Sequence, residues 1–320
     1  MPLFETIPID IEHVRQLARE HWNVELGECA KASQNHTFYA KKNTTERFVL
    51  RVTPDPRNER LNSTKLEVAT LDYLHENHLP VCRTIPSVLT SSNVVHSDPL
   101  ILCLFTFATG EPVVYTDWTW MTTREIVVGL GRWFARLHTL TQRFVQEQPE
   151  LAAHARLWTT LHDGVLAEVP VDEHDQKTVS DPKQFGLIHG DVNPSNYYWD
   201  PSLGMPCMFD WDQLQRCWFL YDLSAPIWGV MSLERYGSPI DRSSVPQANS
   251  ELYLAWILEG YQSDESGFVV DRAALQRMIL IRRELYNRFC RRAILEIPAD
   301  HPMASFCKSV VDAFDKEEQK

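Results

Sequence analysis

The sequence lacks the features that mark several whole classes of protein. No apolar run approaches the ~20 residues that a membrane-spanning helix needs, and no internal repeat or low-complexity tract occurs. The N-terminus carries no basic flank followed by an apolar core, so we expect no secretory signal. Positive charge is also scarce, with 31 Lys and Arg against 43 Asp and Glu and a formal net charge of -12. This balance argues against nucleic acid or an anionic membrane as the main partner.

Cysteine pairs at redox or metal-binding spacing are missing as well. The seven cysteines include no Cys-x-x-Cys, their number is odd, and Cys103 and Cys207 stand inside apolar runs. Such cysteines are typical of buried free thiols in a reducing compartment. We therefore expect a cytoplasmic protein.

The sequence does contain enough apolar material for a large core. Hydrophobic residues make up 44% of the 320 positions and charged residues 23%, which argues against wholesale disorder. The length predicts two lobes. An apolar strand runs into a loop rich in Gly and Pro at residues 106–112, and we place the boundary there. The predicted lobes are residues 1–106 and 107–320.

The stretch with the clearest chemistry is Gly-Leu-Ile-His-Gly-Asp-Val-Asn-Pro-Ser-Asn-Tyr-Tyr-Trp, residues 186–199. It holds a carboxylate, Asp191, and a carboxamide, Asn196, separated by a tight polar turn. Phosphoryl transfer uses such a pair: the carboxylate takes the proton of the acceptor hydroxyl, and the amide oxygen helps to hold magnesium. Because Asp, Asn and Pro are also ordinary turn formers, a purely structural turn is the alternative.

A predicted hairpin follows directly. Residues 197–200 and 205–210 flank the sequence Pro-Ser-Leu-Gly-Met-Pro, which has strong turn chemistry, so the hairpin brings Asn196 beside Asp210. Amide and carboxylate oxygens are ligands that magnesium prefers. Asp210 also follows an apolar Cys-Met-Phe, where a carboxylate needs a cation. Asp212 could reach the metal too, but we expect it to be a solvated surface carboxylate.

Two polar residues near this stretch have supporting roles in our interpretation. Asp222 precedes a predicted helix, where helix capping is the default role and bracing the turn of Asp191 is the alternative. We expect His189 to hold the same turn through hydrogen bonds.

The first lobe offers a second pair of charges. Residues 47–53 predict a strand in which Arg51 interrupts an apolar run, and residues 61–77 predict a helix with Glu67 on its inward face. An unpaired charge is costly in either place. An Arg51–Glu67 pair would resolve both and would supply the strand cation and helix anion that orient nucleotide phosphates in kinase folds. A plain structural salt bridge is the alternative.

Weaker signals concern the rest of a nucleotide site. Ser33 and Asn35 lie in the predicted turn between the first two strands, where they could bond phosphate oxygens or serve as cross-strand polar residues. No Gly-x-Gly-x-x-Gly supports the first of these readings. Phe105 and Phe107, at the lobe boundary, could pack near an adenine ring or simply within the core.

Three segments together carry a family resemblance. His-Gly-Asp-Val-Asn-Pro-Ser-Asn at residues 189–196, Phe-Asp-Trp at 209–211 and Tyr-Asp-Leu-Ser at 221–224 resemble the aminoglycoside phosphotransferase/choline kinase-like family. The resemblance extends from the strand of Arg51 to about Tyr261. It implies an α+β, bilobal, protein-kinase-like fold, with a small N-terminal lobe of antiparallel sheet and helix and a larger, mainly helical C-terminal lobe. It also implies transfer of the γ-phosphoryl group of ATP, with Mg²⁺, to a small-molecule hydroxyl.

The resemblance also assigns roles to residues. Asp191 matches the catalytic base, Asn196 and Asp210 match the magnesium ligands, and Arg51 with Glu67 matches the phosphate-orienting pair.

Two positions depart from the family pattern. Arg51 stands where many members carry lysine, which replaces a point charge by a planar fork. Cys217 stands where glycine is usual. Neither departure removes a catalytic group.

The acceptor is indicated only in outline. Net acidity and four tryptophans that could line an acceptor pocket hint at an amine-bearing compound, such as an amino alcohol, an amino acid or an aminoglycoside-like molecule. Core packing is the alternative for these residues, which are Trp211, Trp218, Trp228 and Trp256.

Two other functions stay open. One is an atypical protein Ser/Thr kinase, although the segment between Asp210 and Asp222 is too short for an activation segment and no Ala-Pro-Glu follows. The other is a nucleotide-binding pseudokinase scaffold. The presence of a candidate base and two candidate metal ligands argues against a scaffold.

Overall fold

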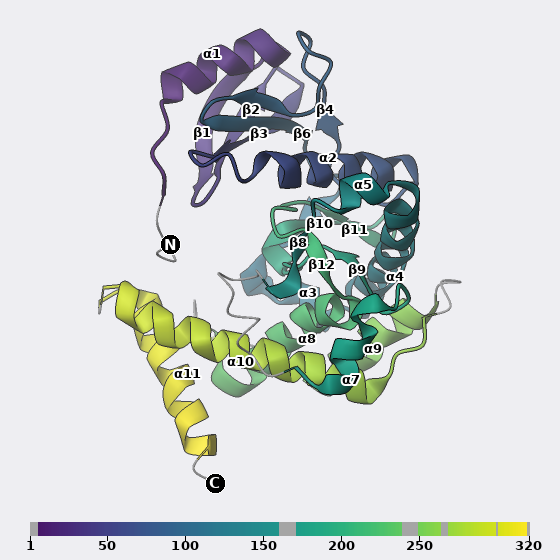
Figure 1. The fold of residues 1–320 in the computed structure, drawn as a ribbon. Coiled ribbons are helices and arrows are strands. Elements are labelled where there is room, and N and C mark those ends of the chain that lie inside the picture. Colours follow the sequence, from purple (N-terminus) through teal and green to yellow (C-terminus); the bar gives the residue numbers. More distant parts are fainter. Residues whose placement is uncertain (1–5, 160–170, 239–248, 264–267, 299, 319–320) are drawn as a thin grey trace.

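The computed structural model describes residues 6–159, 171–238, 249–263, 268–298 and 300–318 of the chain. These residues form a first lobe, built from an antiparallel sheet and two helices, and a larger, mainly helical second lobe (Figure 1). The predicted α+β class with two unequal lobes is confirmed. The division at residue 106 stays our own assignment.

The first-lobe sheet has the strand order β1–β2–β3–β6–β4, and β5 pairs with β6. All these pairings are antiparallel. The strands are β1 (Glu25–Ala32), β2 (His36–Lys41), β3 (Arg47–Pro54), β4 (Thr84–Ile85), β5 (Val95–Ser97) and β6 (Leu100–Thr106). The strand predicted over residues 47–53 is β3, the central strand of this sheet.

Helix α1 (Ile11–Trp22) covers the outer face of the sheet (Figure 1). The Asp10 carboxylate caps it by accepting the backbone N–H groups of Glu12 and His13, at 3.0 and 3.2 Å. On its inner side Val14 is fully buried in the core of the first lobe.

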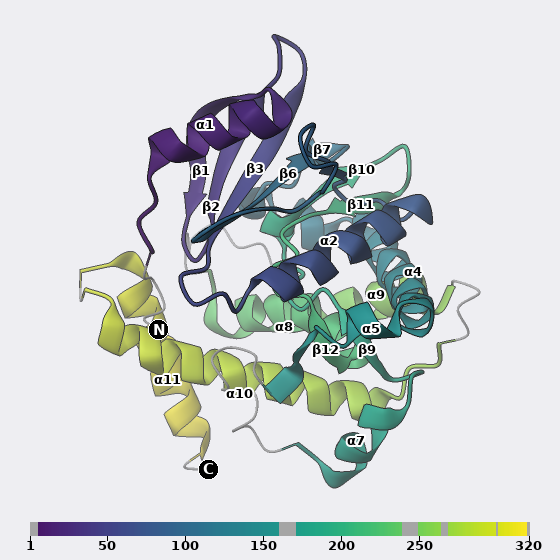
Figure 2. The same ribbon diagram turned by 45° about the horizontal axis from the view of Figure 1, so that its top comes forward.

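Helix α2 (Leu61–Glu76) lies between the first-lobe sheet and the second lobe in both views (Figures 1 and 2). Leu66, Leu71 and Leu74 belong to the main core cluster of the second lobe. Because its apolar side joins that core, α2 fixes the first lobe on the second while carrying Glu67 toward β3.

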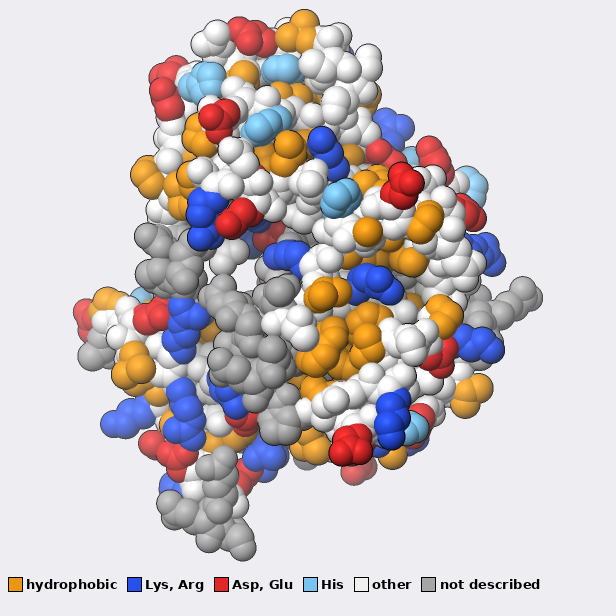
Figure 3. Space-filling model, viewed as in Figure 1, with side chains coloured by type: hydrophobic (Ala, Val, Ile, Leu, Met, Phe, Trp, Pro, Cys, Tyr) orange, Lys and Arg blue, Asp and Glu red, His pale blue; other side chains and the backbone are white. Residues whose placement is uncertain are grey.

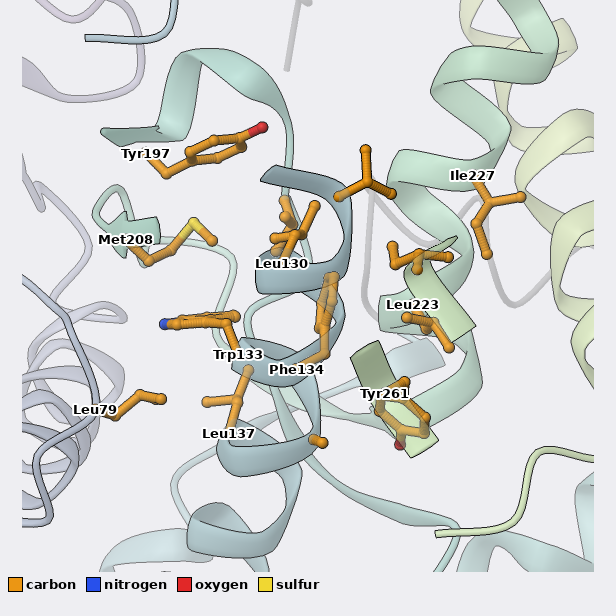
Figure 4. Packing of buried hydrophobic residues seen from close by; sticks show 14 of the residues in the cluster. Leu79, Leu130, Trp133, Phe134, Leu137, Tyr197, Met208, Leu223, Ile227 and Tyr261 are labelled. Carbon is orange, nitrogen blue, oxygen red and sulfur yellow. The ribbon is translucent and has the colours of Figure 1, made fainter. Parts of the chain in front are cut away.

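Helix α4 (Arg124–Glu147) is the axis of the second lobe. Leu130, Trp133 and Phe134 are at most 1% exposed. Trp133 points to the side of Met208, and the ring of Phe134 packs edge-on against that of Trp133, with ring centres 5.7 Å apart (Figure 4). A helix that is apolar on several faces must be buried, and α4 is surrounded by the other elements of this lobe.

The remaining helices surround α4 or extend the lobe away from the first-lobe sheet, and α10 runs along that far side (Figure 2). They are α3 (Thr119–Thr122), α5 (Pro149–Ala152), α7 (Glu173–Lys177), α8 (Phe219–Tyr236), α9 (Ser250–Ser263), α10 (Arg272–Glu296) and α11 (Pro302–Glu318). On the face shown in Figure 3, acidic and basic side chains are interspersed over both lobes.

Two small sheets place the predicted site. One has the order β11–β10–β7 and the other β8–β12–β9. Their strands are β7 (Glu111–Pro112), β8 (Arg156–Leu157), β9 (Phe185–Ile188), β10 (Tyr197–Asp200), β11 (Met205–Met208) and β12 (Gln215–Trp218).

The pairing of these strands brings two loops together. Ile188 at the end of β9 lies opposite Gln215 at the start of β12. Tyr197 at the start of β10 lies opposite Met208 at the end of β11. The segments 189–196 and 209–214 are therefore held side by side at both ends, which confirms the predicted hairpin.

Three of the four tryptophans considered for an acceptor pocket are core residues. Trp211, Trp218 and Trp228 are at most 6% exposed, and Trp256 packs partly buried against the same core. Core packing, the alternative considered for them, is confirmed for Trp218 and Trp228, whereas the buried Trp211 also contributes to the walls of two cavities.

All seven cysteines are free, and only Cys29 is exposed. Within the part of the chain that the structure describes, no helix combines the length and apolarity that crossing a bilayer requires.

The contact between α4 and α9 depends on glycine. A Cβ atom added at Gly260 would lie 2.0 Å from the Val128 carbonyl oxygen, and one added at Gly131 would lie 2.1 Å from the Ile257 carbonyl oxygen. These two helices pack backbone against backbone.

We predict that Gly260→Ala lowers the free energy of unfolding by about 2 kcal/mol or more, because the added methyl group has no space. Gly229→Ala is the matched control, since a Cβ at this helical glycine of α8 meets nothing within 4 Å. The control should raise stability by up to ~1 kcal/mol, the helix propensity difference. Urea denaturation measures both, and equal effects would contradict the packing described for α4 and α9.

Candidate active site

The loop that follows β9 is braced by a buried carboxylate from α8. Asp222 accepts the backbone N–H groups of His189 and Gly190, at 3.0 and 2.9 Å, and is fully buried. Behind it, His138 Nε2 lies 3.4 Å from the same carboxylate, and the other ring nitrogen of His138 bonds the Tyr261 hydroxyl at 2.9 Å. These contacts fix the start of the loop against the core of the second lobe.

The role expected for Asp222 by default is therefore wrong, and the alternative is right. Helix α8 begins at Phe219, upstream of the predicted start, and its N-cap residue Trp218 makes no side-chain capping bond. Asp222 lies inside the first turn, where it braces the loop.

His189 also holds the loop, as predicted. Its Nε2 bonds the Phe209 carbonyl oxygen at 3.1 Å, and its Nδ1 accepts the Asp191 backbone N–H at 3.3 Å. The first contact requires a proton on Nε2 and the second leaves Nδ1 as an acceptor. His189 thus ties the loop 189–196 to the loop 209–214.

The side chains of Asp191 and Asn196 are in contact at the opening of the cleft between the two lobes. The amide nitrogen of Asn196 donates to the Asp191 carbonyl oxygen at 2.9 Å and to its carboxylate Oδ2 at 3.0 Å. Asn193 bonds the other carboxylate oxygen at 3.2 Å. Because Asn196 uses its NH₂ group on Asp191, its Oδ1 is the atom that can face a cation.

Asp210 comes to the same place from the neighbouring loop. The backbone N–H of Phe209 donates to the Asn196 carbonyl oxygen at 2.9 Å, which sets the two loops in register. Asp210 itself adopts φ 62°, a left-handed conformation that Asp tolerates better than most residues. Asn196 and Asp210 both line one cavity.

Within the described residues, no group of three or more His, Cys, Asp and Glu side chains is arranged to hold a metal ion. Asn196 and Asp210 offer two oxygen ligands, which is the number magnesium commonly takes from protein when phosphates and water complete its shell. The donor set present here fits that ion.

Arg51 and Glu67 form the predicted ion pair between β3 and α2. Both terminal nitrogens of Arg51 bond the two carboxylate oxygens of Glu67, at 2.7 and 2.6 Å, and both side chains are buried. Burial disfavours the charged form of Arg51 and by itself lowers the pKa of this group. The attraction and hydrogen bonds of the Glu67 carboxylate together have a larger effect, so the pKa of Arg51 is raised. The guanidinium also lies 5.3 Å from the ring centre of Phe105.

The cavity of about 350 Å³ lies between the first-lobe sheet and the hairpin of β10 and β11. One part of its wall is apolar and aromatic, with Tyr39, Val49, Leu71, Cys82, Phe105 and Phe107. The other part is charged or polar, with Lys31, Arg51, Glu67, Asn196 and Asp210. An apolar end beside a polar end suits a ligand that joins a flat ring to a charged group.

The two phenylalanines predicted near a nucleotide therefore lie in the cavity wall. Phe107 stacks on Tyr39 with ring centres 5.8 Å apart and carries the Arg47 guanidinium at 4.4 Å. Their contact with an adenine ring stays a prediction.

The two loop residues predicted to contact phosphate lie elsewhere. Ser33 and Asn35 belong to the turn between β1 and β2, as expected, but neither is part of the cavity wall. The Asn35 side chain accepts from Thr53 Oγ1 at 2.9 Å and donates to Asp212 Oδ2 at 3.0 Å. Asn35 therefore links the first lobe to the second lobe, and phosphate contact by these two residues stays a prediction.

Asp212 is not a solvated surface carboxylate, which corrects our expectation. It is half-buried, bonded by Asn35, and lines a second cavity of about 820 Å³ on the other side of Arg51. Burial, and then the Asp210 carboxylate, raise the pKa of Asp212 to about 6. Trp211 contributes to the walls of both cavities, and Asp212 lines the second one. The sequence pattern around Asp212 did not indicate that this carboxylate would be half-buried.

Carboxylates crowd this end of the cleft. Desolvation by the surrounding protein raises the pKa of Asp191, and the neighbouring Asp210 carboxylate raises it further, although the residue itself is exposed. Like charges this close disfavour each other's ionised form and attract a cation. One such cation is Lys31 of β1, whose Nζ donates to Asp210 Oδ2 at 3.0 Å. Lys31 was not among the residues predicted for the site, because no local pattern distinguishes it from other lysines.

Comparison with known proteins shows the family to which the chain belongs. The phosphotransferase enzyme family matches residues 27–262. Amicoumacin kinase of Bacillus subtilis (strain 168) is 23% identical over 248 residues, which cover 72% of this chain and 69% of that protein.

Solved structures share the fold. An amicoumacin kinase in complex with AMP-PNP, Ca²⁺ and Ami superposes with a TM-score of 0.72 at 18% identity, covering 95% of this chain and 94% of that one. A microcompartment-associated aminopropanol kinase has a TM-score of 0.62 at 17% identity, covering 97% and 98%. A spectinomycin phosphotransferase has a TM-score of 0.60 at 11% identity, covering 98% and 100%.

The fold and the matched segment define a small-molecule phosphotransferase with a protein-kinase-like fold. The chain belongs to the phosphotransferase enzyme family, and the resemblance inferred from its motifs is confirmed.

We predict that Asp222→Ala costs about 3–5 kcal/mol of stability, because two buried N–H groups and His138 lose their partner. In the fraction that remains folded, turnover should fall about 100-fold as the loop of Asp191 shifts. Urea denaturation and steady-state kinetics measure the two effects. Asp312→Ala, on an exposed position of α11, is the control and should change stability by less than ~0.5 kcal/mol. Unchanged turnover in Asp222→Ala would show that the loop does not need this brace.

Proposed function

We propose that this enzyme transfers the γ-phosphoryl group of ATP to a hydroxyl group of a small molecule, with Asp191 as the base. The observation that carries the proposal is the position of Asn196, which bonds the Asp191 carboxylate at 3.0 Å and lines the same cavity as Asp210. One side chain thus stands between a candidate base and a candidate metal ligand. This is the arrangement that in-line phosphoryl transfer requires.

Asp191 would take the proton of the acceptor hydroxyl. Asn193 and Asn196 each bond one of its carboxylate oxygens, so the carboxylate is oriented before the acceptor arrives. Desolvation by the surrounding protein raises the pKa of Asp191, which makes its ionised form a better proton acceptor.

Asn196 Oδ1 and the Asp210 carboxylate would hold Mg²⁺, which neutralises phosphate charge in such reactions. Arg51, fixed by Glu67, would face the phosphates from β3. The aromatic wall with Phe105 and Phe107 would receive the adenine ring, and the turn of Ser33 and Asn35 would cover the phosphates.

We further propose an acceptor that carries an amine beside its hydroxyl. Support comes from the carboxylates Asp210 and Asp212, which line neighbouring cavities, from Asp191 beside Asn196, and from the net charge of -12. Proteins with this fold include an aminopropanol kinase and an ethanolamine kinase. A cytoplasmic location is part of the same proposal, supported by seven free thiols.

Asp191→Asn should lower kcat with ATP about 10²- to 10⁴-fold, because the carboxamide accepts no proton from the hydroxyl group. AMP-PNP affinity, measured calorimetrically with Mg²⁺, should stay within about threefold of wild type, because the amide keeps the size of the side chain and Asp191 is not part of the wall of the cavity proposed for the nucleotide, although one of the bonds from Asn193 and Asn196 is lost. Asp312→Asn, at an exposed position of α11, is the control. Equal turnover in Asp191→Asn and wild type would rule out Asp191 as the base, and nucleotide binding without turnover of any acceptor by wild type would favour a scaffold.

Matched acceptors test the amine. We predict that aminopropanol and ethanolamine are phosphorylated with kcat/KM at least about tenfold higher than propanol and ethanol, since each pair differs only in the charged group. Phosphorylated product is quantified by mass spectrometry, and homoserine serves as an acceptor with both charge signs. If the alcohols without an amine react as well as the amino alcohols, the amine proposal is wrong while the phosphotransfer proposal stands.

A further inference from the structure

Among the residues that the structure describes, the cavity wall has two basic side chains, Lys31 and Arg51, and Lys31 is the one with room to move. It lies near the end of β1 and donates to Asp210 Oδ2 at 3.0 Å, across the gap between the lobes. Its side chain is 59% exposed and that of Asp210 is 23% exposed. Such a half-solvated pair contributes little to stability, so the lysine can change partners at low cost.

Arg51 is in the opposite situation. Both of its terminal nitrogens bond the two Glu67 oxygens, and its side chain is 8% exposed. A buried bidentate pair is neutral as a unit and rigid, because leaving either charge unpaired is costly. Lys31 and Arg51 are the Lys and Arg residues among the described residues of this cavity wall. An anion that enters the cavity therefore meets these two cations. Arg51 is held in its pair with Glu67, whereas Lys31 is free to change its partner.

The Asp210 carboxylate cannot bind the Lys31 ammonium group and a divalent cation at the same time without repulsion between the two. Under the proposed function, its carboxylate and Asn196 Oδ1 hold Mg²⁺. A divalent ion on that carboxylate repels the ammonium group 3.0 Å away. Phosphate oxygens in the same cavity offer the ammonium group a stronger partner than a shared carboxylate, since they carry several charges.

We propose that Lys31 binds the nucleotide phosphates, and that it leaves Asp210 for them when the nucleotide and the metal ion bind. The proposal rests on the proposed function and adds a phosphate-binding residue from β1 to the pair on β3 and α2. It makes Lys31 and the metal ion competitors for Asp210. A nucleotide that draws Lys31 away should therefore strengthen metal binding, and the metal should strengthen nucleotide binding by the same factor.

Replacing Lys31 should have effects of opposite sign on the two ligands. In Lys31→Met, affinity for AMP-PNP with Mg²⁺ should fall roughly 10- to 100-fold, the scale of losing one charge-assisted hydrogen bond. Affinity for Mn²⁺ alone should rise, because Asp210 has lost its competitor. Calorimetry measures the first affinity, and the electron paramagnetic resonance signal of free Mn²⁺ measures the second. Lys31→Arg should retain most of the nucleotide affinity.

Lys41→Met is the matched control, because Lys41 is an exposed lysine on the neighbouring strand β2 and is not part of the cavity wall. It should leave both affinities within about twofold of wild type, and melting temperatures show that each variant is folded. If Lys31→Met fails to fold, Lys31→Gln replaces it. Nucleotide affinity unchanged in the Lys31 variant, or weakened Mn²⁺ binding, would overturn the role of Lys31 while wild-type turnover preserves the proposed function. A wild type that binds no AMP-PNP would overturn both.

Discussion

The site depends on one buried carboxylate. Asp222 lies in the core of the second lobe and holds the backbone of His189 and Gly190, with His138 behind it. Burying a carboxylate is costly unless every oxygen is bonded, and these donors meet that requirement. Because His138 belongs to α4, the central helix of the lobe couples directly to the loop of Asp191. The position of the candidate base therefore depends on how the helices of this lobe pack.

Charge is divided between the lobes in a complementary way. The first lobe supplies Lys31 and Arg51, the latter paired with Glu67, and the second lobe supplies the carboxylates Asp210 and Asp212, with Asp191 close by. Under the proposed function, negative phosphates and a positive metal ion would lie between these two sets. Contacts such as the bond from Asn35 to Asp212 also join the lobes, so the electrostatics that would bind the ligand also help to hold the cleft together.

Local patterns in the sequence predicted the parts of the site that follow from local chemistry. The turn at residues 201–206 fixed the hairpin register, which brought Asn196 beside Asp210. The cost of burying single charges predicted the pair of Arg51 with Glu67. Lys31 could not be found this way, because β1 is irregular and mostly exposed, and its partner comes from the other lobe. Asp212 was misjudged for the same reason, since its burial comes from contact with the first lobe.

A crystal of the wild type with AMP-PNP and Mn²⁺ tests the central claim most directly, because anomalous scattering locates the metal ion without reference to activity. The account predicts a peak about 2 Å from both Asn196 Oδ1 and an Asp210 carboxylate oxygen, the distance range of Mg²⁺-like coordination, with phosphate oxygens in the same shell. A metal ion bound to the nucleotide but touching neither residue would contradict it.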